Sequence, residues 1–217
     1  MVFMPPFAAL AADPTARLDA LALALAAELR PADADAALAA LDELAGEVGE
    51  VVTSTGGELA ALRFVLGERH GFAGAEEEYD HPDHSMLDLV LERRRGLPIA
   101  LSVVYVETAR RAGIALDGVG LSGHYVVGQF RPGVAPVLLD PFRGGQPIAA
   151  PRPSEVRPWT AHETTLRMLN NLVGSYTRRN DLGRAIRAAE MRLELSLEPA
   201  LREALAAELR GLRARLN

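Results

Sequence analysis

Residues 96–102, with the sequence GLPIALS, open the segment that decides the fold. The Gly-Leu pair ends the preceding helical pattern. Pro98 suits the first turn of a new helix, because the backbone N–H that proline lacks would have no hydrogen-bond partner within the helix at that position. The chain then stays almost wholly apolar until Glu107, which predicts a helix buried on most of its faces. Gly113 is typical of the residue that follows the end of a helix. We therefore expect a buried central helix over residues 98–112.

The hydrophobic pattern changes its period after this helix. Three short stretches are rich in β-branched and aromatic residues, which favour strands, and they cover residues 116–120, 123–130 and 134–140. The turn-forming residues 131–133, with the sequence RPG, join the last two stretches. The sequence therefore predicts a small antiparallel sheet.

Two polar residues stand out in the predicted hairpin. A turn centred near Pro132 pairs position 124 with position 140 if the strands pair directly, so His124 and Asp140 are expected to lie beside each other, within a residue or two, on adjacent strands. A histidine held by an aspartate is the base half of a nucleophilic triad, because the carboxylate fixes the tautomer of the ring and stabilises its charged form. The alternative is a buried polar pair in which each side chain satisfies the other.

Helical periodicity lies on both sides of this centre. Apolar residues recur every three or four positions before it, and the helical pattern returns after Glu155. We expect the second N-terminal helix to end near Gly46 or Gly49, and a proline-rich strip over residues 147–158 to be a linker. The chain is therefore predicted to be an α+β protein with three regions: an acidic helical region at 1–73, a core at 74–150 and a helical region at 151–217.

The composition excludes several kinds of chemistry. The 217 residues include no cysteine, which removes disulfides, thiolate metal sites and a thiol nucleophile. All 23 basic residues are arginine, so lysine Schiff-base chemistry is excluded as well. Residues 1–92 carry 4 arginines against 18 acidic residues, which argues against a nucleic-acid partner. We find neither a bilayer-spanning apolar run nor a basic secretory leader, and we expect a cytoplasmic protein without a membrane partner.

Two histidines and two aspartates lie together in the polar loop segment Asp80–His84. These side chains are able to hold a metal ion, but adjacent residues converge on one ion only in a tightly folded loop, and no helical metal-binding spacing is present. The alternative is a solvated loop in which Asp83 or Ser85 caps the next helix. We favour the capping loop, and we expect no metal and no cofactor.

Three motifs together resemble the SirB-type branch of the transglutaminase-like superfamily. They are GLPIALS at 96–102, GHYVV at 123–127 and DPFRGG at 140–145, and the resemblance extends over about residues 8–195. Residues 168–176, with the sequence MLNNLVGSY, resemble the tetratricopeptide-like helical hairpin of that family. The resemblance implies a papain-like or transglutaminase-like core with a small antiparallel sheet, flanked by an N-terminal helical region and a C-terminal helical hairpin.

The resemblance also implies roles for individual residues. His124 and Asp140 fill the histidine and aspartate positions of the superfamily's triad, whereas the position of its cysteine falls on or beside Pro98, which has no nucleophile. SirB-type proteins commonly lack that cysteine. The family's Asn-Ser pair before the preceding helix is replaced here by residues 84–85, with the sequence HS, which weakens any role for this pair. The resemblance therefore favours a non-catalytic module that binds a protein or peptide in the vestigial cleft.

A serine in place of the cysteine would make the chain a hydrolase or acyl transferase. Ser102 lies one helical turn beyond Pro98 and is the best candidate to act with His124 and Asp140. The alternative role of Ser102 is that of a small residue at a packing surface, with its hydroxyl bonded to a carbonyl one turn back.

The C-terminal helices carry an arginine-rich surface. Its arginines are Arg178, Arg179, Arg184, Arg187 and Arg192. Such a surface is usually a solvated face. It could also meet the acidic N-terminal third of another copy, so a homodimer is possible.

Overall fold

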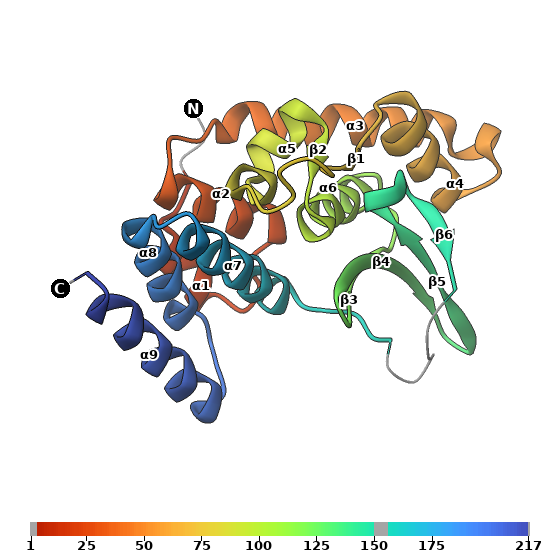
Figure 1. Cartoon of the computed structure of the whole chain (residues 1–217). Coiled ribbons are helices and arrows are strands. Elements are labelled where there is room, and N and C mark those ends of the chain that lie inside the picture. The colour runs from red at the N-terminus through yellow and green to blue at the C-terminus, as the bar shows by residue number, and fades with distance from the viewer. Residues whose placement is uncertain (1–3, 150–155, 217) are drawn as a thin grey trace.

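The computed structural model describes residues 4–149 and 156–216. It is an α+β fold in which a four-stranded antiparallel sheet lies beside a central helix, with further helices around both. The central helix α6 (Pro98–Arg111) packs against the sheet on one side and against N-terminal helices on the other (Figure 1). The predicted fold class is therefore confirmed.

Helix α6 has the boundaries that its sequence predicts. Leu97 is its N-cap and Pro98 its first residue, and most of its side chains are buried. The helix ends at Arg111, and Gly113 follows with φ of 73°, a left-handed conformation that glycine adopts without strain. The apolar run behind Pro98 thus forms the centre of the molecule.

The sheet contains the three predicted strands and one more. Its strands follow the order β3 (Asp117–Leu121), β4 (His124–Arg131), β5 (Val134–Asp140) and β6 (Gln146–Ile148). A separate parallel pair joins β1 (Ala73–Gly74) to β2 (Arg95–Gly96). Strands β1, β2 and β6 are only two or three residues long, too short to produce an alternating pattern in the sequence.

The N-terminal region contains the predicted helices with one correction. Helix α3 does not end at Gly46 or Gly49 but continues to Thr55, where Gly56 takes a left-handed φ of 89°. Its apolar face stays buried as far as Val48, and this packing outweighs the cost of two interior glycines. The elements of this region are α1 (Phe7–Ala12), α2 (Leu18–Leu29), α3 (Ala34–Thr55), α4 (Glu58–Leu62) and the π-helix η1 (Arg63–Arg69). The core region then contains the 3-10 helix η2 (Pro82–Ser85) and helix α5 (Leu87–Arg93) before α6.

The C-terminal region consists of three helices. They are α7 (Ala161–Arg178), α8 (Leu182–Glu194) and α9 (Pro199–Ala214). A capping box of Thr160 and Glu163 begins α7. The hydrogen bond from Arg157, with a smaller contribution from the capping-box hydrogen bonds, lowers the pKa of Glu163 to about 2. The predicted linker at 147–158 begins inside β6, and its residues 150–155 lie outside the described structure.

Part of the arginine-rich C-terminal surface contacts the acidic N-terminal third of the same chain. Arg187 pairs with Glu28 at 3.0 Å, Arg184 donates to the carbonyl oxygen of Leu29 at 3.1 Å, and Arg178 pairs with Asp80. The opposite charges of the two chain ends are thus joined within one molecule. Whether copies of the chain also associate stays a prediction.

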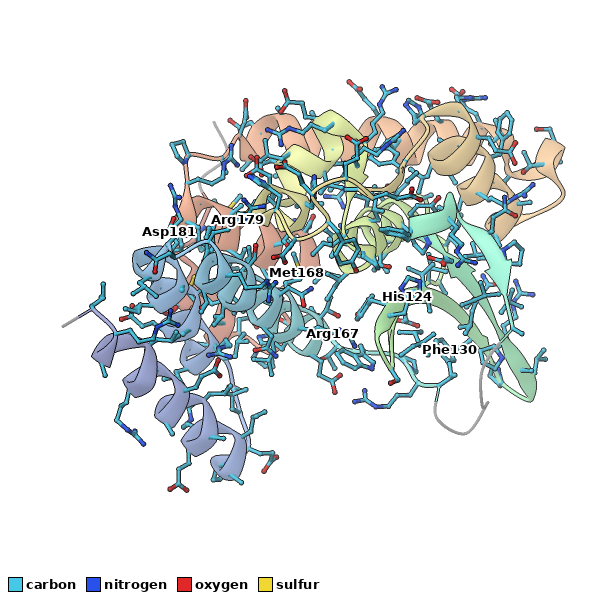
Figure 2. All side chains as sticks on the ribbon, in the orientation of Figure 1. His124, Phe130, Arg167, Met168, Arg179 and Asp181 are labelled. Atoms are coloured by element: carbon cyan, nitrogen blue, oxygen red, sulfur yellow. The ribbon has the colours of Figure 1, made fainter. Side chains whose placement is uncertain are left out.

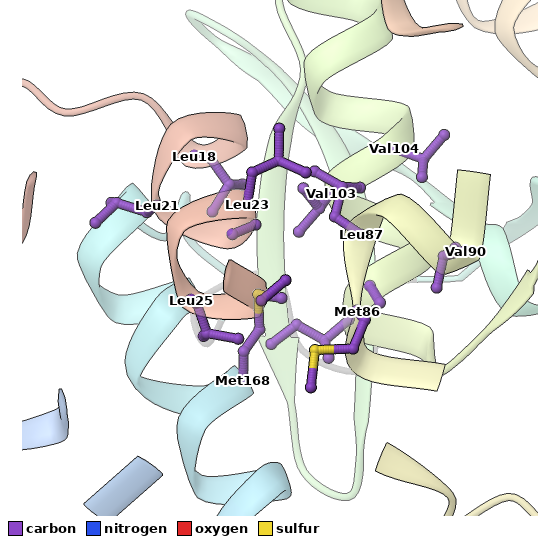
Figure 3. Packing of buried hydrophobic residues seen from close by; sticks show 14 of the residues in the cluster. Leu18, Leu21, Leu23, Leu25, Met86, Leu87, Val90, Val103, Val104 and Met168 are labelled. Carbon is purple, nitrogen blue, oxygen red and sulfur yellow. The ribbon is translucent and has the colours of Figure 1, made fainter. Parts of the chain in front are cut away.

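One hydrophobic cluster runs through all three predicted regions. It includes Phe7, Leu101 and Leu212, and Figure 3 shows side chains of α2, α5, α6 and α7 meeting in it. A smaller cluster of Val119, Val126, Leu138 and Val156 lies on the sheet. The boundaries at 73 and 150 stay a prediction. In the described part of the chain, no helix is both long enough and apolar enough to cross a membrane.

Candidate functional site

The structure brings His124 and Asp140 together. His124 is the first residue of β4, Asp140 is the last residue of β5, and the distance from His124 Nε2 to Asp140 Oδ2 is 3.1 Å. The His124 side chain is 31% exposed, whereas that of Asp140 is 4% exposed. The pair therefore consists of an accessible imidazole and a buried carboxylate that fixes the orientation of its ring.

The two residues are diagonal neighbours, two residues away from a direct pair, which is within the range that the hairpin count predicts. The turn is centred between Pro132 and Gly133, since Arg131 pairs with Val134, and a bulge between Gln129 and Arg131 shifts the register by one more residue. The two shifts add to two residues, as the pairing of Val127 with Leu139 shows. Because side chains alternate along a strand, a shift of two keeps both residues on the same face.

The residues after β5 hold the Asp140 carboxylate in place. Its Oδ1 accepts a hydrogen bond from the backbone N–H of Phe142 at 3.0 Å, and it thereby caps the short 3-10 helix η3 (Pro141–Arg143). Gly144 and Gly145 follow with φ of 65° and 77°, which turns the chain so that the Gly145 N–H donates to the Asp140 carbonyl oxygen at 2.8 Å. The motif at 140–145 is therefore a tight structural loop that positions Asp140.

We expect this loop to depend on its close approach to Gly67 in η1. A Cβ added at Gly67 would lie 2.0 Å from the backbone oxygen of Gly144, so Gly67→Ala is expected to lower the free energy of unfolding by about 1–3 kcal/mol. The control is Gly46→Ala inside α3, where a Cβ meets nothing within 4 Å and is expected to add up to about 1 kcal/mol. Urea unfolding measures both, and equal changes would contradict the argument.

Aromatic side chains extend from His124 across the surface. The Phe142 ring lies 6.3 Å from the His124 ring and 6.0 Å from the Tyr79 ring, both in edge-to-face geometry. The Tyr79 side chain is 48% exposed. These three rings form one partly exposed surface, which we call the His124 surface: His124, Phe142 and Tyr79. Sequence reasoning missed Tyr79 because its loop is 45 positions away from His124 and only the fold brings them together.

Arg167, on helix α7, binds the backbone at the start of β4, where His124 lies. Its guanidinium donates to the carbonyl oxygen of His124 at 3.0 Å and to that of Leu121 at 3.3 Å, so it spans the turn between β3 and β4 (Figure 2). The same group lies over the rings of Tyr125 and Trp159, at 5.6 Å and 5.7 Å from their centroids. Arg167 thus holds the backbone that carries His124, and no local sequence signal indicates this role.

Pro98 and Ser102 both lie inside the protein. Pro98 is buried at the start of α6. Ser102 is 1% exposed, and its hydroxyl donates to the Pro98 carbonyl oxygen at 2.8 Å, one turn back in the same helix. Among the hydrogen bonds of the described residues, none joins Ser102 to His124. This arrangement matches the packing role that we considered for Ser102 and does not supply a nucleophile within reach of a base.

The polar residues at 80–84 are engaged with different partners. Asp80 pairs with Arg178, Asp83 pairs with Arg93 at 2.8 Å, and the His81 ring accepts the backbone N–H of Asp83 at 3.3 Å. Within the described residues, no group of three or more histidine and acidic side chains is arranged to hold a metal. The expected cap is wrong: Asp83 and Ser85 lie inside η2, and α5 follows Met86 without a side-chain cap.

One cavity adjoins the His124 surface at the start of α6. It has a volume of about 100 Å³, and its lining includes Tyr79, Ser85 and Leu97. Neither His124 nor Asp140 lines this cavity or three others formed by described residues. Tyr79 thus borders this cavity, whereas the partly exposed His124 lies outside it. The exposed parts of the His124 surface are accessible to a chain segment.

Comparison with known proteins identifies the class of this fold. A family model described as "Transglutaminase-like superfamily" matches residues 35–187, which is more than half of the chain. The chain therefore belongs to the transglutaminase-like superfamily.

Its individual relatives are bacterial and eukaryotic proteins. The chain is 37% identical over 157 residues to a UPF0162 protein of Xylella fastidiosa, a match covering 64% of this chain and 56% of that protein. It is 36% identical over 138 residues to a UPF0162 protein of Pseudomonas aeruginosa, covering 62% and 50%. A match to human F-box only protein 21, 31% identical over 84 residues, covers 39% and 13%. The chain thus spans about half the length of these two bacterial relatives, and no solved structure matches it significantly.

Proposed function

We propose that this chain is a non-catalytic, SirB-type member of the superfamily that binds a protein or peptide segment on the His124 surface. The observation that carries the proposal is the combination of an accessible, oriented His124–Asp140 pair with a buried proline at the start of α6. By the resemblance, the position of the family's cysteine falls on or beside that proline, which has no nucleophile. The three-region division of the chain and its cytoplasmic location belong to the same proposal.

The chemistry of the His124 surface suits a peptide. An exposed imidazole is able to donate or accept a hydrogen bond with a peptide backbone. Tyr79 and Phe142 add rigid aromatic contact area, which is typical of residues that dominate binding energy at protein interfaces. Arg143, with a side chain 76% exposed, adds a positive charge beside Asp140.

The hydrolase or acyl-transferase alternative with Ser102 has less support. A serine nucleophile must reach the base within about 2.6–3.2 Å and must also meet the substrate. Ser102 is buried, and its hydroxyl is bonded within its own helix. Labelling with a fluorophosphonate that disappears in Ser102→Ala would favour the enzyme.

The binding proposal is tested with a phage-displayed library of random heptapeptides. We expect selection on the wild-type protein to enrich peptides whose Kd, measured by calorimetry, rises at least roughly tenfold in Tyr79→Ala, as expected for the loss of an aromatic anchor. The control is Leu201→Ala, which removes an exposed apolar side chain from α9, away from the site. Peptides that bind both variants equally, or the absence of enrichment, would overturn the proposal.

A further inference from the structure

A second cavity lies far from His124, where helices α7, α8 and α9 meet. Its volume is about 500 Å³. Polar side chains and apolar ones both line it, and the former include a nearly inaccessible arginine. Its lining residues are Asn170, Val173, Gly174, Thr177, Arg178, Arg192, Leu205, Glu208 and Leu212.

Arg192 is the unusual member of this lining. It is 3% exposed, and its Nη1 contacts Asn170 Oδ1 at 3.0 Å and Glu208 Oε2 at 2.9 Å. Its Nε and Nη2 are buried and have no hydrogen-bond partner in the described structure, and the same holds for the Thr177 hydroxyl. Buried donors without a partner are rare in proteins, because each loses its bond to water without gaining another.

The two free nitrogens define the chemistry of the missing acceptor. Nε–H and Nη2–H lie on one edge of the planar guanidinium and point the same way, so they match the two oxygens of a carboxylate. Asp80 and Glu208 already face Arg178 and Arg192, so the charge balance suits a singly charged group better than a dianion. Val173, Leu205 and Leu212 offer apolar contacts beside it, as a peptide residue requires.

We propose that this cavity, enlarged by an outward movement of α9, binds the carboxylate of a peptide, with the free edge of Arg192 and the Thr177 hydroxyl as its donors. In the closed structure these donor atoms are inaccessible to solvent, so the ligand reaches them only after α9 has moved. Helix α9 buries only three of its own side chains, Leu205, Leu209 and Leu212, which keeps the cost of such a local movement low. Glu208 sits against Arg192 as an internal competitor. This site is separate from the His124 surface and goes beyond the proposed function.

The test uses the Nε–Hε NMR signal of Arg192 in the full-length protein, assigned by its loss in Arg192→Lys. The probes are the tripeptide Ala-Val-Leu with a free C-terminus, its C-terminal amide, and amidated Ala-Glu-Leu. We expect saturable shifts with the first or third probe and none with the amide of Ala-Val-Leu. Shifts with free Ala-Val-Leu alone would show that the site binds a C-terminal carboxylate, and shifts with amidated Ala-Glu-Leu would show that it binds a side-chain carboxylate.

Two variants and one control keep the result specific. Thr177→Val is expected to weaken binding roughly tenfold, as the loss of a hydrogen bond to a charged group does, and Glu208→Gln to strengthen it. Arg210→Gln changes an exposed arginine of α9 that does not line the cavity, and it is expected to leave the affinity unchanged. Equal shifts with the carboxylate and the amide, or no effect of Thr177→Val, would overturn the proposal. Tyr79→Ala does not change a residue of this cavity, so a failure of the carboxylate proposal can be distinguished from a failure of the proposal for the His124 surface.

Discussion

Arg111→Ala is expected to lower the free energy of unfolding by about 3–5 kcal/mol, the range typical of removing one partner from a buried ion pair. Arg111 contacts Asp19 at 2.5 Å and Glu107 at 2.9 Å, and these two carboxylates are 0% and 2% exposed. Without Arg111 they would stay buried with much less positive charge nearby. The Asp19 contact also joins α2 to α6, so its loss weakens the link between two helices of the core.

The neighbouring Arg110 provides a matched control in the same helix. Its side chain is 42% exposed and contacts Glu107 at 2.8 Å, so Arg110→Ala is expected to cost about 1 kcal/mol or less. In Arg111→Ala the buried Glu107 carboxylate keeps only the exposed Arg110 as a charged partner. Adding Glu107→Gln removes this buried charge, so we expect the double variant to be more stable than the sum of the two single effects predicts. Urea unfolding followed by circular dichroism is measured for the wild type, for the single variants Arg110→Ala, Arg111→Ala and Glu107→Gln, and for the double variant. Equal losses for the two arginines would contradict a role for burial.

The sequence predicts those parts of the fold that depend on local patterns. The apolar run behind Pro98 determines α6, and alternation with turn residues determines β3 to β5. The placement of His124 beside Asp140 follows from hairpin counting, even though the turn centre and a bulge each shift the register by one residue. An odd total shift would have placed the two side chains on opposite faces of the sheet.

The parts that the sequence could not predict depend on contacts between distant segments. Helix α3 continues past Gly46 and Gly49 because its apolar face is buried against other elements. The local occurrence of glycine in the sequence does not indicate this burial. Arg167 reaches the β3–β4 turn from a helix more than forty residues further along the chain. The unpartnered edge of Arg192 becomes visible only when the contacts of α7, α8 and α9 are known.

Pro98→Cys is expected to create a reactive thiol without creating an enzyme. The chain has no cysteine, so the introduced thiol is the only one, and its alkylation by iodoacetamide can be followed directly against pH. A helix N-terminus lowers the pKa of a thiol, and Pro98 is the first residue of α6. We therefore expect alkylation at lower pH than for an ordinary cysteine, once local opening exposes the buried position.

A reactive thiol alone is not sufficient for catalytic turnover of an acyl substrate. Acyl transfer needs donors aimed at the developing oxyanion, and losing one such donor costs roughly 10²–10³ in kcat. The nearby Ser102 hydroxyl already donates to the Pro98 carbonyl oxygen. If the resemblance to SirB-type proteins holds at residues 84–85, the family's Asn-Ser pair is replaced here by His-Ser. Hydrolysis of a glutamine peptide and of a thioester by Pro98→Cys should therefore match that of Pro98→Ser. Saturable turnover that His124→Ala abolishes would show instead that the site retains its catalytic machinery, and that a single side chain separates this protein from an active transglutaminase-like enzyme.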